Sequence, residues 1–185
     1  MCALPILTLR GPQTRIVDLA GKTVIPGMVD AHGHVSGLGT ALSVVDLTGA
    51  SSYDEIIARV VARSKTVAPG GWITGRGWDQ NRWGNTAFPT HDKLTAALPN
   101  NPVVLVRVDG HALLANKKAM DAAGLSAATK DPSGGHIERT ADGAPSGVFV
   151  DNAQALVQRV VPAPTREETK RQIQAAIAEI GRAHV

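Results

Sequence analysis

Apolar residues recur at two different spacings along the chain. Between residues 52 and 67 they follow a helical period, with Ile56 and Val60 on one face, and this spacing predicts an amphipathic helix. Residues 72–77 and 103–108 are strand-like, and the second run is apolar enough for a buried strand. Because both periods occur, the pattern predicts a mixed α/β fold.

Turn and cap residues predict the remaining elements. They indicate two short strands within 14–26 with a turn at 20–22, a strand over 28–35, a short helix over 91–98, a helix over 112–123, a hairpin around 142–143, and a helix over 165–178. The last helix opens on Thr165 with Glu168 three residues later, which is the spacing of a capping box. No internal repeat or low-complexity segment interrupts this order.

The composition narrows the class of protein. Hydrophobic residues make up 43% and charged residues 19%, as in ordinary globular proteins. No apolar run approaches the about 20 residues of a membrane span, so no membrane partner is expected. The net charge of +3 is spread over scattered basic residues and aromatic residues are only 3%, which argues against a nucleic-acid partner. The single cysteine, Cys2, fits a reducing compartment and predicts a cytoplasmic protein.

The segment around Asp30, His32 and His34 is the main candidate for chemistry. On a strand these three side chains share one face, because side chains alternate with period two. Neutral imidazoles at positions i and i+2 can both reach one divalent ion at about 2.0–2.1 Å. Taken alone, this pattern is also satisfied by two partly exposed histidines at the end of a strand, and that interpretation is the commoner one.

Four motifs in order resemble one enzyme group. The run GKTVIPGMVDAHGHV is similar to the amidohydrolase superfamily, whose first barrel strand ends in D-x-H-x-H. Three later motifs resemble the branch called amidohydrolase family 3, which includes N-substituted formamide deformylases: GWITGRGWDQNRW, PVVLVRVDGHALLAN and GGHIERTADGAPSGVFVDNA. The resemblance extends from about residue 14 to residue 178.

The resemblance implies a (β/α)8 barrel joined to a small β-sandwich, with a metal at the mouth of the barrel. It implies hydrolysis of carbon–nitrogen bonds other than peptide bonds in a small-molecule, amide-type substrate, by Zn²⁺ or another divalent ion, with one or two ions in the full-length enzyme. Such an ion lowers the pKa of bound water towards about 7 and polarises the scissile carbonyl. His32 and His34 would be two metal ligands, while Asp30 would orient the strand or a histidine.

The length limits how much of that architecture is present. A complete barrel takes about 250 residues, so the chain is expected to be an inactive N-terminal fragment whose acid/base Asp lies beyond it. The expected parts are a β-sandwich remnant (1–26), the first barrel strand with the metal motif (27–35), an α+β insertion (36–161), the first barrel helix (162–179) and a terminal segment (180–185). That last segment matches the translation of a common sequencing-library adapter; alternatively, Gly181 is a natural helix stop.

Four other residues are weaker candidates. Asp109 and His111 follow an expected strand and could contact substrate, or could simply cap a turn. Trp78 could line the substrate pocket or belong to the core. Asp151 could approach the metal, although the cap of a helix over 152–161 is the more favoured role.

Two competing functions remain open at this point. The chain could be a non-catalytic remnant, or a small β/α binding module in which His32 and His34 are structural. The missing metal ligands separate the remnant from a hydrolase, because a complete enzyme needs further histidines and an Asp downstream. Metal analysis of the purified chain identifies the binding module, which should contain no stoichiometric zinc. The residues define neither the substrate nor the oligomeric state.

Overall fold

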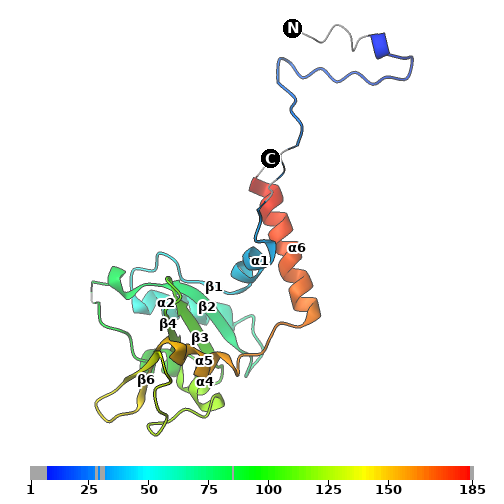
Figure 1. The fold of residues 1–185 in the computed structure, drawn as a ribbon. Helices are drawn as coiled ribbons and strands as arrows, with labels where there is room; N and C mark the ends of the chain where they lie inside the picture. Colours follow the sequence, from blue (N-terminus) through cyan, green and yellow to red (C-terminus); the bar gives the residue numbers. More distant parts are fainter. Residues whose placement is uncertain (1–7, 28, 30–31, 85, 184–185) are drawn as a thin grey trace. The chain divides into compact units, whose positions relative to one another are not determined.

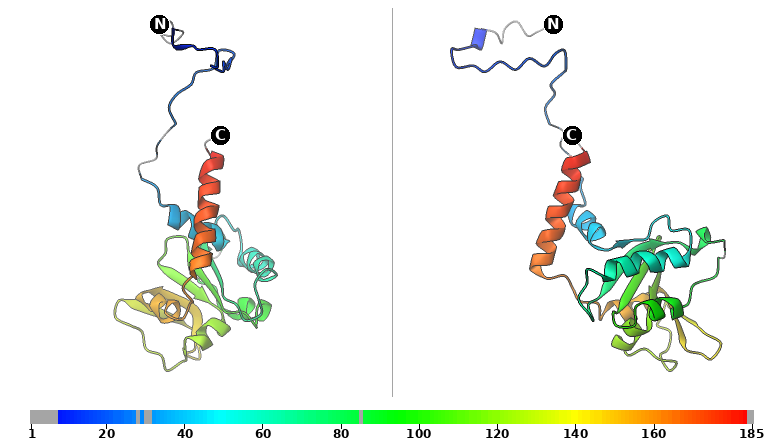
Figure 2. Two further views of the ribbon diagram at one scale, coloured as in Figure 1. Left: turned by 90° about the vertical axis from the view of Figure 1, so that its right-hand side faces the viewer. Right: turned by 180° about the vertical axis from the view of Figure 1, so that it is seen from behind.

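A computed structural model of the chain describes residues 8–27, 29, 32–84 and 86–183, and Figures 1 and 2 show it from three sides. The chain divides into two units, residues 1–33 and residues 34–185. In the described part of the first unit the predicted turn is present, since Ala20 and Gly21 have φ values of 50° and 84°. The two predicted flanking strands are absent from the described residues. A strand needs a hydrogen-bonding neighbour, and no described strand pairs with this segment.

The predicted strand over 28–35 is wrong where the structure describes it. Val29 and residues 32–34 have no strand geometry, and Val35 begins a helix, α1 (Val35–Ser43). His34 is the residue before that helix, with φ −93° and ψ 61°. Asp30 lies outside the described residues. A barrel strand depends on paired neighbours on both sides, and the described strands offer none to this segment.

The second unit is built on a six-stranded sheet of order β1-β2-β3-β4-β6-β5. The strands are β1 (Val45–Asp46), β2 (Ile73–Trp78), β3 (Val103–Arg107), β4 (Ala112–Ala115), β5 (Gly135–Arg139) and β6 (Pro145–Asp151). β1, β2 and β3 are parallel, and the other neighbours are antiparallel. β2, β3 and β6 therefore end, and β4 begins, at one edge of the sheet, which we call the carboxyl edge.

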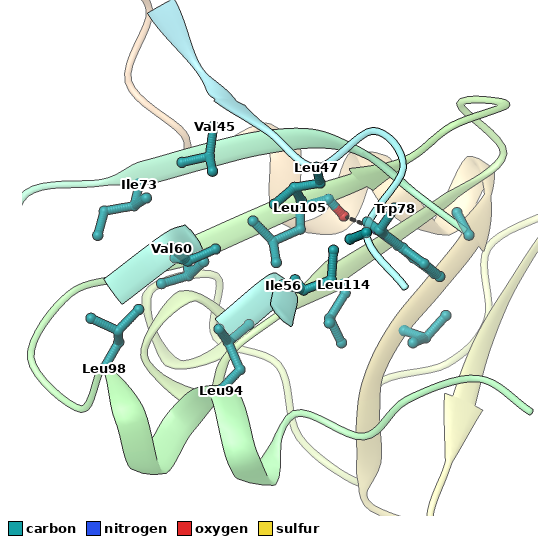
Figure 3. Packing of buried hydrophobic residues seen from close by; sticks show 14 residues of the cluster. Val45, Leu47, Ile56, Val60, Ile73, Trp78, Leu94, Leu98, Leu105 and Leu114 are labelled. Atoms are coloured by element: carbon teal, nitrogen blue, oxygen red, sulfur yellow. Dashed lines mark hydrogen bonds between the residues drawn. The ribbon is translucent and has the colours of Figure 1, made fainter. Parts of the chain in front are cut away.

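Helices cover both faces of the sheet. The helices of the sheet body are α2 (Tyr53–Ser64), η2 (Gln80–Arg82), α3 (Asp92–Ala97), α4 (Lys117–Ala122), η3 (Asn152–Gln154) and α5 (Ala155–Gln158). The last helix, α6 (Arg166–Ala183), lies beside α1 and contributes no residue to the two cores of the sheet body. On one face Val60 of α2 and Leu94 of α3 belong to the same buried cluster as Leu105 of β3 (Figure 3). On the other face α4 and α5 supply residues such as Met120 and Val157. The result is a three-layer mixed α/β fold with two cores. None of the described helices has the length and apolar composition needed to cross a bilayer.

The helix predicted over residues 112–123 is correct only in its second half. Ala112–Ala115 form β4, which pairs with β3 on one side and β6 on the other, and all four residues are buried. Alanine and leucine favour helices locally, but two neighbouring strands supply more hydrogen bonds and apolar cover than one helical turn would. Asn116 then accepts a hydrogen bond from the backbone N–H of Ala119 and starts α4.

α1 and α6 lie side by side, although the chain separates them by more than a hundred residues (Figures 1 and 2). Their backbones approach closely at Gly39, where a Cβ atom would lie 2.4 Å from the carbonyl oxygen of Gln172. The Nε2 of Gln172 donates to Oγ of Ser43 at 3.0 Å. The predicted capping box of α6 is present, and the helix continues through Gly181, so the interpretation of Gly181 as a stop is wrong.

Candidate functional site

Polar side chains gather at the carboxyl edge because of the strand order. Arg107 ends β3, the turn into β4 carries Asp109 and His111, and Asp151 ends β6. The register pairs Ala112 with Val150, which places the preceding His111 beside Asp151. The edge therefore combines two of the residues predicted as substrate contacts, Asp109 and His111, with Asp151, the weaker candidate for approaching the metal.

Arg107 and Asp109 form an ion pair within the turn. The Nε of Arg107 donates to Oδ1 of Asp109 at 2.9 Å, and its Nη2 donates to Oδ2. This hydrogen-bonded guanidinium holds the pKa of the Asp109 carboxyl well below its usual range, while Asp109 raises the pKa of Arg107. The guanidinium also lies over the ring of Phe88, 5.7 Å from its centroid. Oδ1 of Asp109 additionally accepts the backbone N–H of His111 at 3.0 Å, so Asp109 fixes the turn.

His111 and Asp151 form a second pair next to the first. Nδ1 of His111 lies 2.8 Å from Oδ1 of Asp151. An ionised carboxylate can only accept, so Nδ1 must carry the proton in this contact. The two side chains are 72% and 51% exposed. An exposed pair of this kind contributes only about 0.2–1 kcal/mol to stability.

The backbone of Asp151 is strained. Its φ of 50° and ψ of −123° lie in a region that side chains other than glycine rarely adopt. Such strain costs on the order of 1–3 kcal/mol and is concentrated at functional sites. The predicted helix-cap role does not offset it, because the Asp151 side chain makes no cap hydrogen bond to η3. The backbone strain at Asp151 costs at least as much as its exposed contact with His111 contributes, which favours a role for Asp151 other than stability.

Trp78 belongs to the core. Its side chain is fully buried, and its indole N–H donates to the carbonyl oxygen of Leu105 at 2.8 Å (Figure 3). It packs against Trp83 and Phe88, with ring centroids 6.0 Å and 6.3 Å away. A side chain without exposed surface cannot contact a substrate, so Trp78 is not included in the candidate site.

The sequence analysis missed Arg107 and the pairing of His111 with Asp151. Arg107 had a detectable signal, because it is the charged residue that interrupts the apolar run 103–108. The pairing had none, since the two residues are 40 positions apart and meet only through the β4–β6 register.

The structure does not assemble a metal centre from the described residues. His32 lies in the first unit and His34 at the start of the second. In the part of the chain that is described, no group of three or more His, Cys, Asp or Glu residues could hold an ion. A catalytic zinc site uses three protein ligands. The metal-ligand roles of His32, His34 and Asp151 therefore stay predictions.

Comparison with known proteins gives a consistent picture. The family model described as "Amidohydrolase family" matches residues 15–185. The chain is 40% identical to the protein LONG AFTER FAR-RED 3 of Arabidopsis thaliana over 147 residues, covering 80% of this chain and 25% of that protein. It is 34% identical to an N-substituted formamide deformylase of Arthrobacter pascens over 148 residues, covering 79% and 27% respectively.

A solved structure is similar across nearly the whole chain. An uncharacterised metal-dependent hydrolase from Pyrococcus horikoshii superposes with a TM-score of 0.65 and 30% identity, covering 99% of this chain and 34% of that one. The chain thus spans about a third or less of the length of these relatives.

Proposed function

We infer, because this chain belongs to the amidohydrolase family, that the protein it represents is a metal-dependent hydrolase of carbon–nitrogen bonds other than peptide bonds. The observation that carries the proposal is the family match over residues 15–185, which includes the D-x-H-x-H motif. The similarity to a metal-dependent hydrolase of Pyrococcus horikoshii supports the metal requirement. A deformylase-like reaction is the more specific proposal, supported by the formamide deformylase of Arthrobacter pascens.

In this proposal His32 and His34 are two of the metal ligands, and Asp30 orients them. A Zn²⁺ or similar ion bound there would supply an activated water and polarise the amide carbonyl. The residues described do not complete such a site by themselves. The remaining ligands and the acid/base Asp would come from polypeptide outside these 185 residues, as would the rest of the barrel.

We propose that the 185-residue chain by itself does not hydrolyse amides. The buried residues of both cores lie within residues 45–157. The packed part of the chain is therefore a sheet module between α1 and α6, and not a barrel. We propose that this module is the insertion predicted over 36–161. A binding role for the module is the second candidate function, and the polar carboxyl edge is the observation that favours it.

The test compares the full-length gene product with its histidine variants. We expect His32→Ala and His34→Ala to lose bound metal and at least about a hundredfold of the hydrolysis of an N-formylated alkylamine. His136→Ala is the matched control, because His136 is also exposed but lies on β5. Metal content is measured by elemental analysis and turnover by release of the amine.

Two results would contradict the proposal. One is a full-length His32→Ala, His34→Ala double variant with normal metal content and normal turnover. The other, which concerns only the fragment, is chelator-sensitive hydrolysis by the 185-residue chain.

A further inference from the structure

We propose that His111 is a ligand-binding residue at the carboxyl edge, that its Nε2 accepts a hydrogen bond from an N–H group of the ligand, and that Asp151 is its positioning residue. The chemical class of ligand is an amine or the amine side of an N-acyl amine. This assignment of substrate class rests on the proposed function, because a hydrolase of carbon–nitrogen bonds must accommodate the nitrogen side of its substrate.

The imidazole of His111 has one nitrogen bound by Asp151 and the other open to solvent. Asp151 accepts the Nδ1 proton of His111 at 2.8 Å, which leaves a lone pair on Nε2 of the neutral ring. Among the residues described, no side chain lies within hydrogen-bonding distance of that nitrogen. The ring is 72% exposed, so Nε2 is open to a ligand.

The backbone beneath the His111 ring is fixed by hydrogen bonds from several sides. Oδ1 of Asp109 accepts a hydrogen bond from the backbone N–H of His111. The carbonyl oxygen of His111 accepts another from the backbone N–H of Asp151, at 2.9 Å. The preceding residue, Gly110, has its carbonyl oxygen bound by Nε2 of the buried Gln154 at 2.9 Å. An exposed side chain on an immobilised backbone is the arrangement that a binding residue requires.

The charged groups around the His111 ring are mostly negative. Asp109 and Asp151 both flank His111, and Arg107 is already occupied by Asp109. Asp79 also interacts with Arg107. With the imidazole neutral, the three carboxylates and the one guanidinium leave an excess of negative charge around the ring. This charge favours an ammonium or amide N–H over a carboxylate as the ligand.

His136 provides a matched internal control. Its Nδ1 lies 2.7 Å from Oδ2 of Asp131, so its imidazole is held by a carboxylate in the same way. Its Nε2, however, lies 3.8 Å from Glu138, and Asp131 is also bound by Arg139. The backbone φ of Asp151 is positive, whereas that of Asp131 is not. A comparison of His111 with His136 therefore distinguishes the proposed site from an ordinary His–Asp pair.

The first measurement locates the ring proton in the full 185-residue chain by nitrogen-15 NMR, at about pH 8.5, above the ordinary histidine pKa of about 6.5. We expect His111 to carry the proton on Nδ1. In Asp151→Gly, which adopts a positive φ without strain, this preference is lost, while the His136 ring is unchanged. A wild-type His111 with its proton on Nε2 would overturn the assignment.

The second measurement uses two probes with the same alkyl chain, n-butylammonium chloride and sodium butyrate. We expect butylammonium to shift the His111 ring signals in a saturable manner, butyrate to leave them unchanged, and His136 to respond to neither. The response is lost in Asp151→Gly; if that variant does not fold, the comparison of His111 with His136 in the wild-type chain decides. Equal responses at both histidines, a response to butyrate, or no response refutes the proposal.

Failure of this proposal and failure of the proposed function give different results. The NMR measurements use the 185-residue chain and need neither metal nor turnover. The histidine variants of the full-length protein test hydrolysis without reference to His111. A positive amine response beside an inactive full-length protein would retain the site and reject the hydrolase.

Discussion

Asn116 shows how one buried side chain can join several elements. Its Oδ1 accepts the backbone N–H groups of Val103, at 2.9 Å, and Ala119, at 3.0 Å. Its Nδ2 donates to the carbonyl oxygens of Leu98, at 3.1 Å, and Asn101, at 2.9 Å. The side chain thereby connects the start of β3, the start of α4 and the loop after α3, all without contact with water.

Asn116→Ala is therefore expected to destabilise the chain by about 3 kcal/mol or more, because it leaves buried donors and acceptors without partners. The free energy of unfolding is measured in urea. Asn100→Ala is the control, since Asn100 is exposed, and it should change stability by less than about 0.5 kcal/mol. Equal stability of the two variants would show that water replaces the Asn116 contacts.

At the scale of the residue, the sequence predicted part of the candidate site. Asp109 and His111 could be singled out because they directly follow a buried strand. The role of Asp151 could not, because its positive φ and its contact with His111 both arise from the β4–β6 register. Trp78 was ambiguous for a related reason, since an aromatic residue near a strand end suits a core and a pocket equally.

At the scale of the element, predictions succeeded where local signals and tertiary contacts agree. The α2 helix has both an apolar face and an N-cap at Ser52, and the β5–β6 hairpin has an Asp-Gly turn. They failed at β4, where sheet pairing overrides local helix preference, and at α1. The α1 segment contains two glycines and shows its stabilising contact only in three dimensions, at Gly39 against α6.

Substitution of the α1 glycines tests that contact. In Gly39→Ala the added Cβ would lie 2.4 Å from the Gln172 carbonyl oxygen, so α1 and α6 must separate. Gly37→Ala is the control, because its Cβ would meet only the His34 Cβ, at 3.7 Å. Alanine favours a helix by about 1 kcal/mol over glycine.

Amide hydrogen exchange in α1 reports the difference. We expect faster exchange in Gly39→Ala than in wild type, and unchanged or slower exchange in Gly37→Ala. Slower exchange in both variants would mean that helix propensity outweighs the close approach of the two helices.

At the scale of the whole molecule, the six-stranded sheet is the main folded body of the described chain. The sequence predicted its class and most of its elements, but presented it as an insertion in a barrel whose own first strand the described residues do not show. Such a strand would gain its hydrogen bonds from other barrel strands, so the local sequence specifies it weakly. The six-stranded sheet, in contrast, carries two cores formed by its own strands and covering helices.

Residues 44–164 should therefore fold without α1 and α6. Neither helix contributes a residue to the two core clusters, and both clusters lie inside this range. We expect the 44–164 polypeptide to unfold in a single cooperative transition in urea and to retain the NMR signals of the sheet. A broad, non-cooperative transition would show that the sheet depends on the helix pair.

The contact between α1 and α6 has a consequence for how such proteins can diversify. Because Gly39 and Gln172 bring α1 and α6 together, the helix that precedes the sheet and the helix that follows it lie next to each other. The sheet between the two helices could then be replaced by another domain without moving the segments on either side. A lineage could acquire a new carboxyl edge, with different side chains at the positions of His111 and Asp151, while the segment before α1 stays unchanged.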